Sequence, residues 1–318
     1  MSNKPKILVI RLSAMGDIVL TTPVIRALNQ QLKAKIDFLT KPQYVSLLEG
    51  NTYINRIFSL NDKVNFLQKN KYDYVVDLQN NLRSWKIRNK IQTKSFVFNK
   101  KSLRRYLLIY FGIDLLKNHI VDRYFATVAS LNVVNDNQGL DFNVSSSIKP
   151  EFNTSQSYIA WCIGGTHNPK KLSAKQITQV VSKLKIPVVL LGGNNDLDIA
   201  EEIINNVECK SVYNFCGKLS VQESSYLIKK SKMLLTNDTG MMHIASALKM
   251  PIISFWGCTK PSLGFTPYMT DPSSIKIISK RSPKPCSKHG RHCKYGKNGC
   301  IKEIDPQLIY DSVLSLLK

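Results

Sequence analysis

The chain has 318 residues, 43% of them hydrophobic and 21% charged, which is enough apolar material for packed cores and excludes a disordered protein. Its 45 Lys and Arg outnumber its 22 Asp and Glu, and the net charge of +23 favours an acidic partner: nucleic acid, an anionic membrane surface or a phosphorylated substrate. No stretch approaches the ~20 apolar residues of a membrane span, and the apolar run before Arg11 is too short for a signal peptide, so we expect a cytoplasmic protein whose membrane contact is peripheral.

Elements of the first half follow an alternating pattern. Short β-branched runs alternate with longer amphipathic stretches, as in βα units around a buried parallel sheet. Apolar residues at helical spacing predict a helix over 18–32. The predicted strands lie at 6–11, 36–40, 54–60, 72–78 and 95–98.

A polar segment over 135–157, which contains Pro150, is typical of a linker. Since ~150 residues is a common domain size, we expect one domain over 1–150 and a second over 151–318, with a terminal helix at 306–317 able to pack back on the first. The strands predicted for the second domain lie at 158–163, 187–191, 211–215, 233–236 and 251–255. Because ligands of open α/β sheets bind at the carboxyl ends of the strands, we expect the site between the two domains.

The first candidate motif is the turn from the first strand into the first helix. Gly16 allows close approach of the backbone to a ligand, and the helix start offers unpaired N–H groups. Asp17 follows at the helix start, where it either caps the helix or takes part in chemistry. The dinucleotide fingerprint G-x-G-x-x-G is absent from this turn, so hydride transfer with NAD is not supported.

Three loops of the second half each follow a predicted strand. Residues 236–243 (TNDTGMMH) place capping residues and a glycine before a helix, which suits a phosphate. Residues 164–171 (GGTHNPKK) add paired glycines, a hydroxyl and Lys170, and residues 192–196 (GGNND) can close on a nucleoside. Each alone also fits an ordinary turn, but together they indicate a nucleotide-diphosphate ligand.

With these residues in hand, the chain resembles glycosyltransferase family 9, the heptosyltransferases that build the lipopolysaccharide inner core. KILVIRLSAMGDIVLTTPVIRAL is similar to that family's first strand and helix, and TNDTGMMHIASALKMPIISFWGCTKP to its donor-binding segment. PCSKHGRHCKYGKNGC resembles its cysteine-containing stretch near the C-terminus. The two long motifs lie ~220 residues apart in the order that the family has.

The resemblance implies an α/β protein of the GT-B fold, with two Rossmann-like domains whose parallel sheets face a central cleft. It implies an acceptor in the first domain, a donor in the second, and metal-independent, inverting transfer of heptose from ADP-heptose to the inner core, lipid A-Kdo or a similar acceptor. No cofactor is then required. The partners would be a nucleotide-diphosphate sugar and an acidic lipid-linked saccharide, met at the inner face of an anionic cytoplasmic membrane.

The resemblance also assigns roles to residues. Asp17 matches the proposed catalytic base, and Thr166 and Lys170 match the Thr and Lys that contact the diphosphate. The remaining donor positions are Asp238, Thr239, Gly240 and His243 of a D-T-G-x-x-H motif, Gly193 in the nucleoside loop, and Met15 and Gly16 beside the donor. The chain departs from the family at Asn194 and Asn195, where an acidic residue is frequent, and at Leu172, where an aromatic residue is usual.

Cations of the first domain suit phosphate or carboxylate groups of an acceptor. They are Arg83, Lys86, Arg88, Arg104, Arg105 and Arg123. We select Arg83, because it follows a strand end, together with Arg123 as acceptor contacts. The apolar run 106–111 beside two of these arginines can rest on a bilayer, but a core helix is the preferred interpretation.

Seven cysteines fall into two groups. Those in apolar, strand-like stretches are expected as core residues: Cys162, Cys209, Cys216 and Cys258. Cys286, Cys293 and Cys300 are evenly spaced, with His289 and His292 among them, but match no C-x-x-C knuckle. We prefer a reduced structural segment over a zinc site and place a disulfide third, so no metal site is predicted.

Two other functions remain open. The charge also suits nucleic acid, yet the sequence contains no helix-turn-helix, RNA-binding sheet signature or zinc finger, so no nucleic-acid partner is expected. The second alternative is a GT-B glycosyltransferase that uses another nucleotide sugar, such as a UDP- or GDP-sugar.

Overall fold

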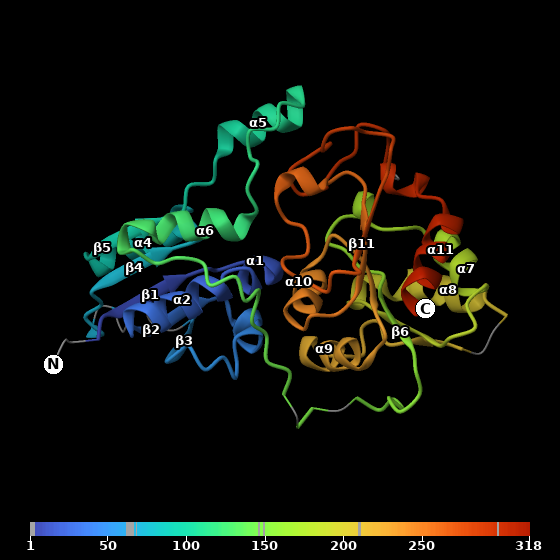
Figure 1. Ribbon diagram of the computed structural model, residues 1–318, viewed down its shortest axis with the longest axis horizontal. Coiled ribbons are helices and arrows are strands. Elements are labelled where there is room, and N and C mark those ends of the chain that lie inside the picture. The colour runs from blue at the N-terminus through green and yellow to red at the C-terminus, as the bar shows by residue number, and fades with distance from the viewer. Residues whose placement is uncertain are drawn as a thin grey trace. The chain divides into compact units, whose positions relative to one another are not determined.

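The computed structural model describes residues 4–61, 67, 69–145, 147–148, 150–208, 211–297 and 299–318. It divides into two compact units, each with its own sheet (Figure 1). The first unit comprises Met1–Lys101 and Asn118–Asn143, and the second comprises Ser102–Lys117 and Val144–Lys318. The division between Asn143 and Val144 therefore falls within the predicted linker, but the segment Ser102–Lys117 of the first half belongs to the second unit. Cys209 lies outside the described residues.

The first unit is built on a five-stranded parallel sheet of order β3-β2-β1-β4-β5. All five strands predicted for this half are confirmed: β1 (Lys6–Ile10), β2 (Lys35–Thr40), β3 (Arg56–Ser59), β4 (Tyr74–Asp77) and β5 (Lys94–Val97). Strand β1 is central, and Ile7 to Ile10 are fully buried. A continuous apolar strand of this kind is expected where helices cover both faces of a sheet.

Helices of the first unit are α1 (Met15–Val19), α2 (Thr22–Leu32), α4 (Leu82–Ile91) and α6 (Ile120–Val128), with short 3-10 turns η1 (Pro42–Leu47) and η2 (Ala129–Leu131). The single helix predicted over 18–32 is thus two helices. Pro23 lies in the first turn of α2, where its missing N–H costs nothing, but it could not continue a helix from α1. The break shortens α1 and leaves Asp17 in its first turn.

Arg26 anchors the last segment of the first unit to α2. Its guanidinium is 2% exposed, bonds both carboxylate oxygens of Asp136 at 2.6 and 2.9 Å, and pairs with Asp141 and the carbonyl of Gly139. Burial alone would lower the pKa of Arg26, but the two carboxylates raise it above its ordinary value. A buried charge is tolerated because it is fully paired.

The second unit contains a six-stranded sheet of order β11-β10-β9-β6-β7-β8, in which all neighbours are parallel. Its strands are β6 (Ile159–Cys162), β7 (Val188–Leu191), β8 (Val212–Asn214), β9 (Leu234–Asn237), β10 (Ile252–Trp256) and β11 (Ile275–Ile278). The first five confirm the prediction. Strand β11 was not predicted, because it is an edge strand with alternating exposure and a Lys in a short run.

Two apolar cores cover the two faces of this sheet. Along β6, Ile159 and Trp161 point into one core, while Ala160 and Cys162 point into the other. The alternation follows the two-residue period of a strand. Both cores are apolar, and polar side chains such as Asn237 and Asp196 lie at the carboxyl edge of the sheet.

Helices and short turns cover both faces of this sheet (Figure 1). The helices are α7 (Ala174–Val181), α8 (Leu197–Asn205), α9 (Val221–Lys230), α10 (Gly240–Ala247) and α11 (Pro306–Leu317), with turns η3 (Asn168–Lys170), η4 (Asn194–Asp196), η5 (Pro261–Leu263) and η6 (Cys300–Glu303). Helix α5 (Ser102–Phe111) belongs to the same unit but contributes to neither core of the sheet. The predicted terminal helix is confirmed as α11. It belongs to the second unit, packs against α7, and buries Ile309 and Val313 in the core of that unit.

Helix α5 is held to the second unit by a small apolar contact. Leu108 and Ile109 pack with Leu116 against Leu263, and the other face of the helix is open to solvent. The expectation of a core helix is therefore wrong for most of its length. Over the described ranges, we find no helix with the length and apolarity needed to cross a membrane.

Candidate functional site

The turn after β1 is fixed by the guanidinium of Arg11. This side chain is 8% exposed, donates to the carbonyl oxygens of Ser13 (2.8 Å) and Leu78 (2.5 Å), and pairs with Asp17 at 2.8 Å. Burial alone would lower the pKa of Arg11, but Asp17 and the neighbouring Tyr124 raise it above its ordinary value. The cation thus ties the ends of two neighbouring strands to one carboxylate.

Asp17 both caps α1 and presents a carboxylate to solvent. One oxygen accepts from the backbone N–H of Ala14 at 3.3 Å, and the other lies 3.4 Å from the hydroxyl of Tyr124, which donates to it. Its side chain remains 25% exposed. Capping and chemistry are therefore compatible at this position, since the capping contact is long. Met15 and Gly16 form the first turn of the same helix and are half-buried.

The predicted acceptor cations lie in different surroundings. Arg83 is exposed in the first turn of α4, directly after β4, at the same sheet edge as Asp17. Arg123 is only 7% exposed on α6, which leaves little of it for a ligand. Arg88 forms an ion pair with the buried carboxylate of Asp77, with Nε 2.9 Å from the nearer oxygen. Of this set, Arg83 is the best placed to meet a ligand; Arg104 and Arg105 belong to α5 of the second unit instead.

In the second unit, the loops after β9, β6 and β7 meet at one edge, because these strands are neighbours in the sheet. Asn237 at the end of β9 joins two of them. Its amide donates to the carbonyls of Ile163 and Gly164 at 3.0 and 2.9 Å, and its side chain is fully buried. No sequence pattern indicated this role, because an Asn next to an Asp is typical only of a turn.

Asp196 joins the third loop to the same edge. Its carboxylate accepts from the ammonium of Lys171 at 2.6 Å and from the backbone N–H of Gly193 at 2.9 Å. Gly164 lies so close that a Cβ there would be 2.3 Å from an oxygen of Asp196. A glycine is therefore needed at this position for packing. Sequence reasoning assigned the loop to a nucleoside and missed that Asp196 and Lys171 are its anchors.

Lys170 and Asp238 form the polar centre of this edge. The ammonium of Lys170, at the end of η3, lies 2.7 Å from a carboxylate oxygen of Asp238. Burial alone would raise the pKa of Asp238, but Lys170, a hydrogen bond from Thr259 and the nearby His243 hold it below its ordinary value. Asp238 thus stays ionised and orients one ammonium. His243 lies in α10 and is 4% exposed.

The N-terminus of α10 follows Asp238 directly. Thr239 is its N-cap residue, but the Thr239 hydroxyl bonds the hydroxyl of Thr236 at 3.1 Å instead of the helix amides. The helix begins at Gly240, so its first N–H groups and its dipole are available beside Lys170. Such a terminus with an adjacent ammonium is suited to bind a phosphate group.

The other predicted donor residues surround this centre. Thr166, Gly193, Asn194 and Asn195 are exposed in the loops after β6 and β7. Leu172, which stands where the resemblance predicts an aromatic sugar contact, is fully buried in the core and cannot contact a sugar. The loops therefore offer a polar rim around Lys170 and α10.

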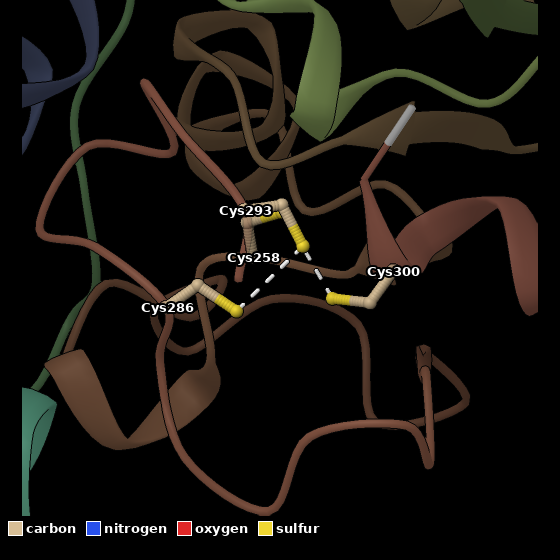
Figure 2. A group of neighbouring side chains, drawn as sticks. All are labelled: Cys258, Cys286, Cys293 and Cys300. Carbon is tan, nitrogen blue, oxygen red and sulfur yellow. Dashed lines mark hydrogen bonds between the residues drawn. The ribbon is translucent and has the colours of Figure 1, made fainter. Parts of the chain in front are cut away.

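The described cysteines form two groups, and one residue, Cys258, is not in the group predicted for it. Cys162 and Cys216 are core residues, as expected. Cys258, expected in the core, instead lies with Cys286, Cys293 and Cys300, and the four sulfurs are all within 4.8 Å of one another (Figure 2). The only sequence feature that could have indicated this grouping is the presence of three further cysteines later in the chain. His289 and His292, which lie between them in sequence, are exposed.

Comparison with known proteins supports the resemblance to glycosyltransferase family 9. Residues 64–297, more than half of the chain, match glycosyltransferase family 9 (heptosyltransferase). Lipopolysaccharide heptosyltransferase 1 of Campylobacter coli is 24% identical over 288 residues, which is 80% of this chain and 84% of that protein. Two solved structures share the fold. A family 9 glycosyltransferase of Veillonella parvula has a TM-score of 0.81 and 19% identity, and the match covers 100% of this chain and 98% of that chain. The ADP-heptose lipopolysaccharide heptosyltransferase II of Escherichia coli has a TM-score of 0.74 and 21% identity, and the match covers 98% of each chain.

Two glycines of the site allow a matched test of its packing. We expect Gly164→Ala to lower the free energy of unfolding by about 1–3 kcal/mol, because the new methyl group must displace Asp196 from Lys171. Gly193→Ala is the control, since the nearest atom to its Cβ would be 4.0 Å away. Urea unfolding of both variants measures the difference. Equal stability of the two would show that Asp196 does not fix the loop.

Proposed function

The chain belongs to glycosyltransferase family 9, the heptosyltransferases, and we propose that it transfers heptose from ADP-heptose to the lipopolysaccharide inner core, with lipid A-Kdo or a similar saccharide as acceptor. The observation that carries the proposal is the pairing of Lys170 with Asp238 beside the open N-terminus of α10. An ammonium and a set of backbone N–H groups in one place match the two charged groups of a diphosphate.

Donor binding uses the loops at the carboxyl edge of the second sheet. The diphosphate lies against Lys170, Thr166 and the first turn of α10, with Thr239 and Gly240 supplying N–H groups and His243 behind them. Gly193 and the exposed amides of Asn194 and Asn195 face the nucleoside. Lys170 exchanges part of its contact with Asp238 for the diphosphate, and Asp238 keeps the ammonium in position.

Transfer proceeds with inversion at the anomeric carbon. Asp17 takes the proton from the acceptor hydroxyl as that oxygen attacks, and the bond to the diphosphate breaks. Negative charge then collects on the leaving diphosphate, where Lys170 and the amides of α10 stabilise it without a divalent metal or other cofactor. Met15 and Gly16 accompany Asp17 beside the donor. The mechanism requires this carboxylate of the first unit to reach the sugar held by the second.

The acceptor is an acidic, lipid-linked saccharide. Arg83 is exposed near Asp17 along the first sheet edge, and its guanidinium suits a phosphate or carboxylate of the inner core. Arg123 takes at most a supporting part, because it is almost wholly buried. The net charge of +23 favours the same kind of partner.

We further propose a cytoplasmic protein in peripheral contact with the inner face of the membrane, through α5. Leu103, Tyr110 and Phe111 of this helix are 72%, 56% and 63% exposed, and Arg104 lies beside them. Apolar side chains next to cations suit the interface of an anionic bilayer.

The donor is identified by incubating the protein with ADP-, UDP- and GDP-sugars and a truncated lipid-linked oligosaccharide, and measuring nucleotide release. We expect release of ADP from ADP-heptose, dependent on the acceptor. Release from a UDP- or GDP-sugar alone would favour a glycosyltransferase with another donor. Gel shift with generic DNA and RNA, set beside protection by ADP against thermal unfolding, tests the nucleic-acid alternative.

Asp17→Asn tests the assignment of the base. The variant keeps an oxygen that can accept from Ala14, so α1 should persist, but it cannot take a proton. We expect kcat to fall by about 10²–10⁴-fold, with protection by ADP against thermal unfolding unchanged.

Asp122→Asn is the matched control for this change. Asp122 occupies the same third position of α6 and accepts from the backbone N–H of His119 at 3.1 Å, as Asp17 does from Ala14. We expect near-normal turnover for the control. A kcat of Asp17→Asn that equals that of Asp122→Asn would remove Asp17 from the chemistry.

Membrane contact is tested with Leu103→Glu combined with Phe111→Glu. Each change removes an apolar group worth ~1.5 kcal/mol or more at the interface, so we expect sedimentation with anionic vesicles to weaken by about tenfold or more. Leu308→Glu is the control, because Leu308 is 51% exposed on α11. Equal binding of the two variants would contradict a role for α5.

A further inference from the structure

Four cysteine sulfurs from two distant parts of the chain meet in the second unit (Figure 2). Cys258 follows β10, Cys286 and Cys293 lie in the segment before η6, and Cys300 is the first residue of η6. The backbone N–H of Cys286 donates to the carbonyl of Cys258 at 2.8 Å, which fixes the two segments to each other. Three of the four residues are buried and Cys293 is half-buried.

The spacing of the sulfurs is that of a tetrahedral site. The sulfurs of Cys286 and Cys293 are 3.8 Å apart, those of Cys258 and Cys300 are 3.9 Å apart, and no pair exceeds 4.8 Å. A metal with four thiolates at 2.3 Å places each pair of sulfurs about 3.8 Å apart. A disulfide would need about 2.05 Å, and among the described cysteines none is in a disulfide.

A buried cation accompanies the cluster. Lys260 is 3% exposed, two residues after Cys258, and its ammonium donates to the carbonyl of Ser279 at 2.6 Å. Burial lowers the pKa of Lys260, and the four nearby cysteines act in the opposite direction. A divalent ion with four thiolates carries two negative charges, and a neighbouring ammonium reduces the cost of burying them.

The same segment packs on the turn that carries Lys170. A Cβ on Gly299 would lie 2.5 Å from the carbonyl oxygen of Pro169, and one on Gly290 would lie 2.4 Å from Cγ of Lys170. Cys258 touches this turn as well, because its thiol donates to the Pro169 carbonyl at 3.2 Å. The cysteine segment and Cys258 therefore pack directly against η3.

We propose that Cys258, Cys286, Cys293 and Cys300 bind one thiophilic metal ion, zinc or iron, that fixes the cysteine segment against the turn bearing Lys170. The ion displaces four thiol protons to solvent, including the one shared with Pro169, and forms four metal–sulfur bonds without any change of oxidation state. Tetrahedral thiolate sites select zinc and iron over harder metals. The spacing is too small for a cluster of several metal ions. The site is structural and takes no part in sugar transfer.

Metal content of the full chain tests this directly. We expect elemental mass spectrometry of protein purified without added metal to give about one zinc or iron per chain, and the element found separates the two. Cys293→Ser, chosen because Cys293 is the least buried of the four, should reduce the content by about tenfold or more. Cys162→Ser, at a core cysteine of the same unit, is the control and should retain the metal.

Cobalt titration provides a second measurement. It uses the wild-type chain, so its result does not depend on whether a variant folds. Protein stripped by a chelator and refilled with Co²⁺ should show the visible absorption of a tetrahedral cobalt thiolate, and its thermal protection by ADP should exceed that of the stripped form. Metal below about 0.1 ion per chain with no cobalt spectrum, or undiminished metal in Cys293→Ser, would overturn the site. Equal protection by ADP with and without metal would overturn the link to Lys170. Metal content and the cobalt spectrum do not depend on the proposed function, whereas the ADP comparison rests on it and is read only once ADP protects the metal-loaded protein.

Discussion

Lys170 and Asp238 come from loops that follow two neighbouring strands, and their 2.7 Å contact holds an ammonium beside the open N-terminus of α10. Both side chains are largely buried, so each charge stabilises the other: Lys170 helps to hold the pKa of Asp238 below its ordinary value, and the carboxylate orients the ammonium. Asn237 and Asp196 hold the surrounding loops to the same sheet edge. The pair therefore lies at the centre of the proposed donor site.

The first unit repeats this arrangement with the signs reversed. There a buried Arg11 positions the carboxylate of Asp17, and the contact ties the turn after β1 to the end of β4. In the second unit the cation is the proposed ligand contact, and in the first unit the anion is. The proposed base and the proposed anion-binding ammonium are therefore each held by an opposite charge at a sheet edge, and polar groups held in this way need little reorganisation during a reaction.

The cysteine segment extends this positioning to residues far along the chain. It is held to β10 through Cys258 and packs with Gly290 and Gly299 against the turn of Lys170. Turns without regular secondary structure have few contacts of their own to fix them. A metal ion that joins four sulfurs would supply that rigidity and so support the donor side of the proposed reaction.

The sequence by itself determined the α/β class, ten of the strands, the terminal helix and the loops that carry Lys170 and Asp238, because buried parallel strands and strand-end motifs are local patterns. It also indicated Asp17, through the motif at the first turn. Only the tertiary structure decided that Arg11 pairs with Asp17, that Asn237 and Asp196 anchor loops, that α5 joins the second unit, and that Cys258 leaves the core to meet three cysteines of the tail. Such contacts join residues far apart in the chain, and which charges and sulfurs meet depends on strand order and loop path, which local periodicity does not encode.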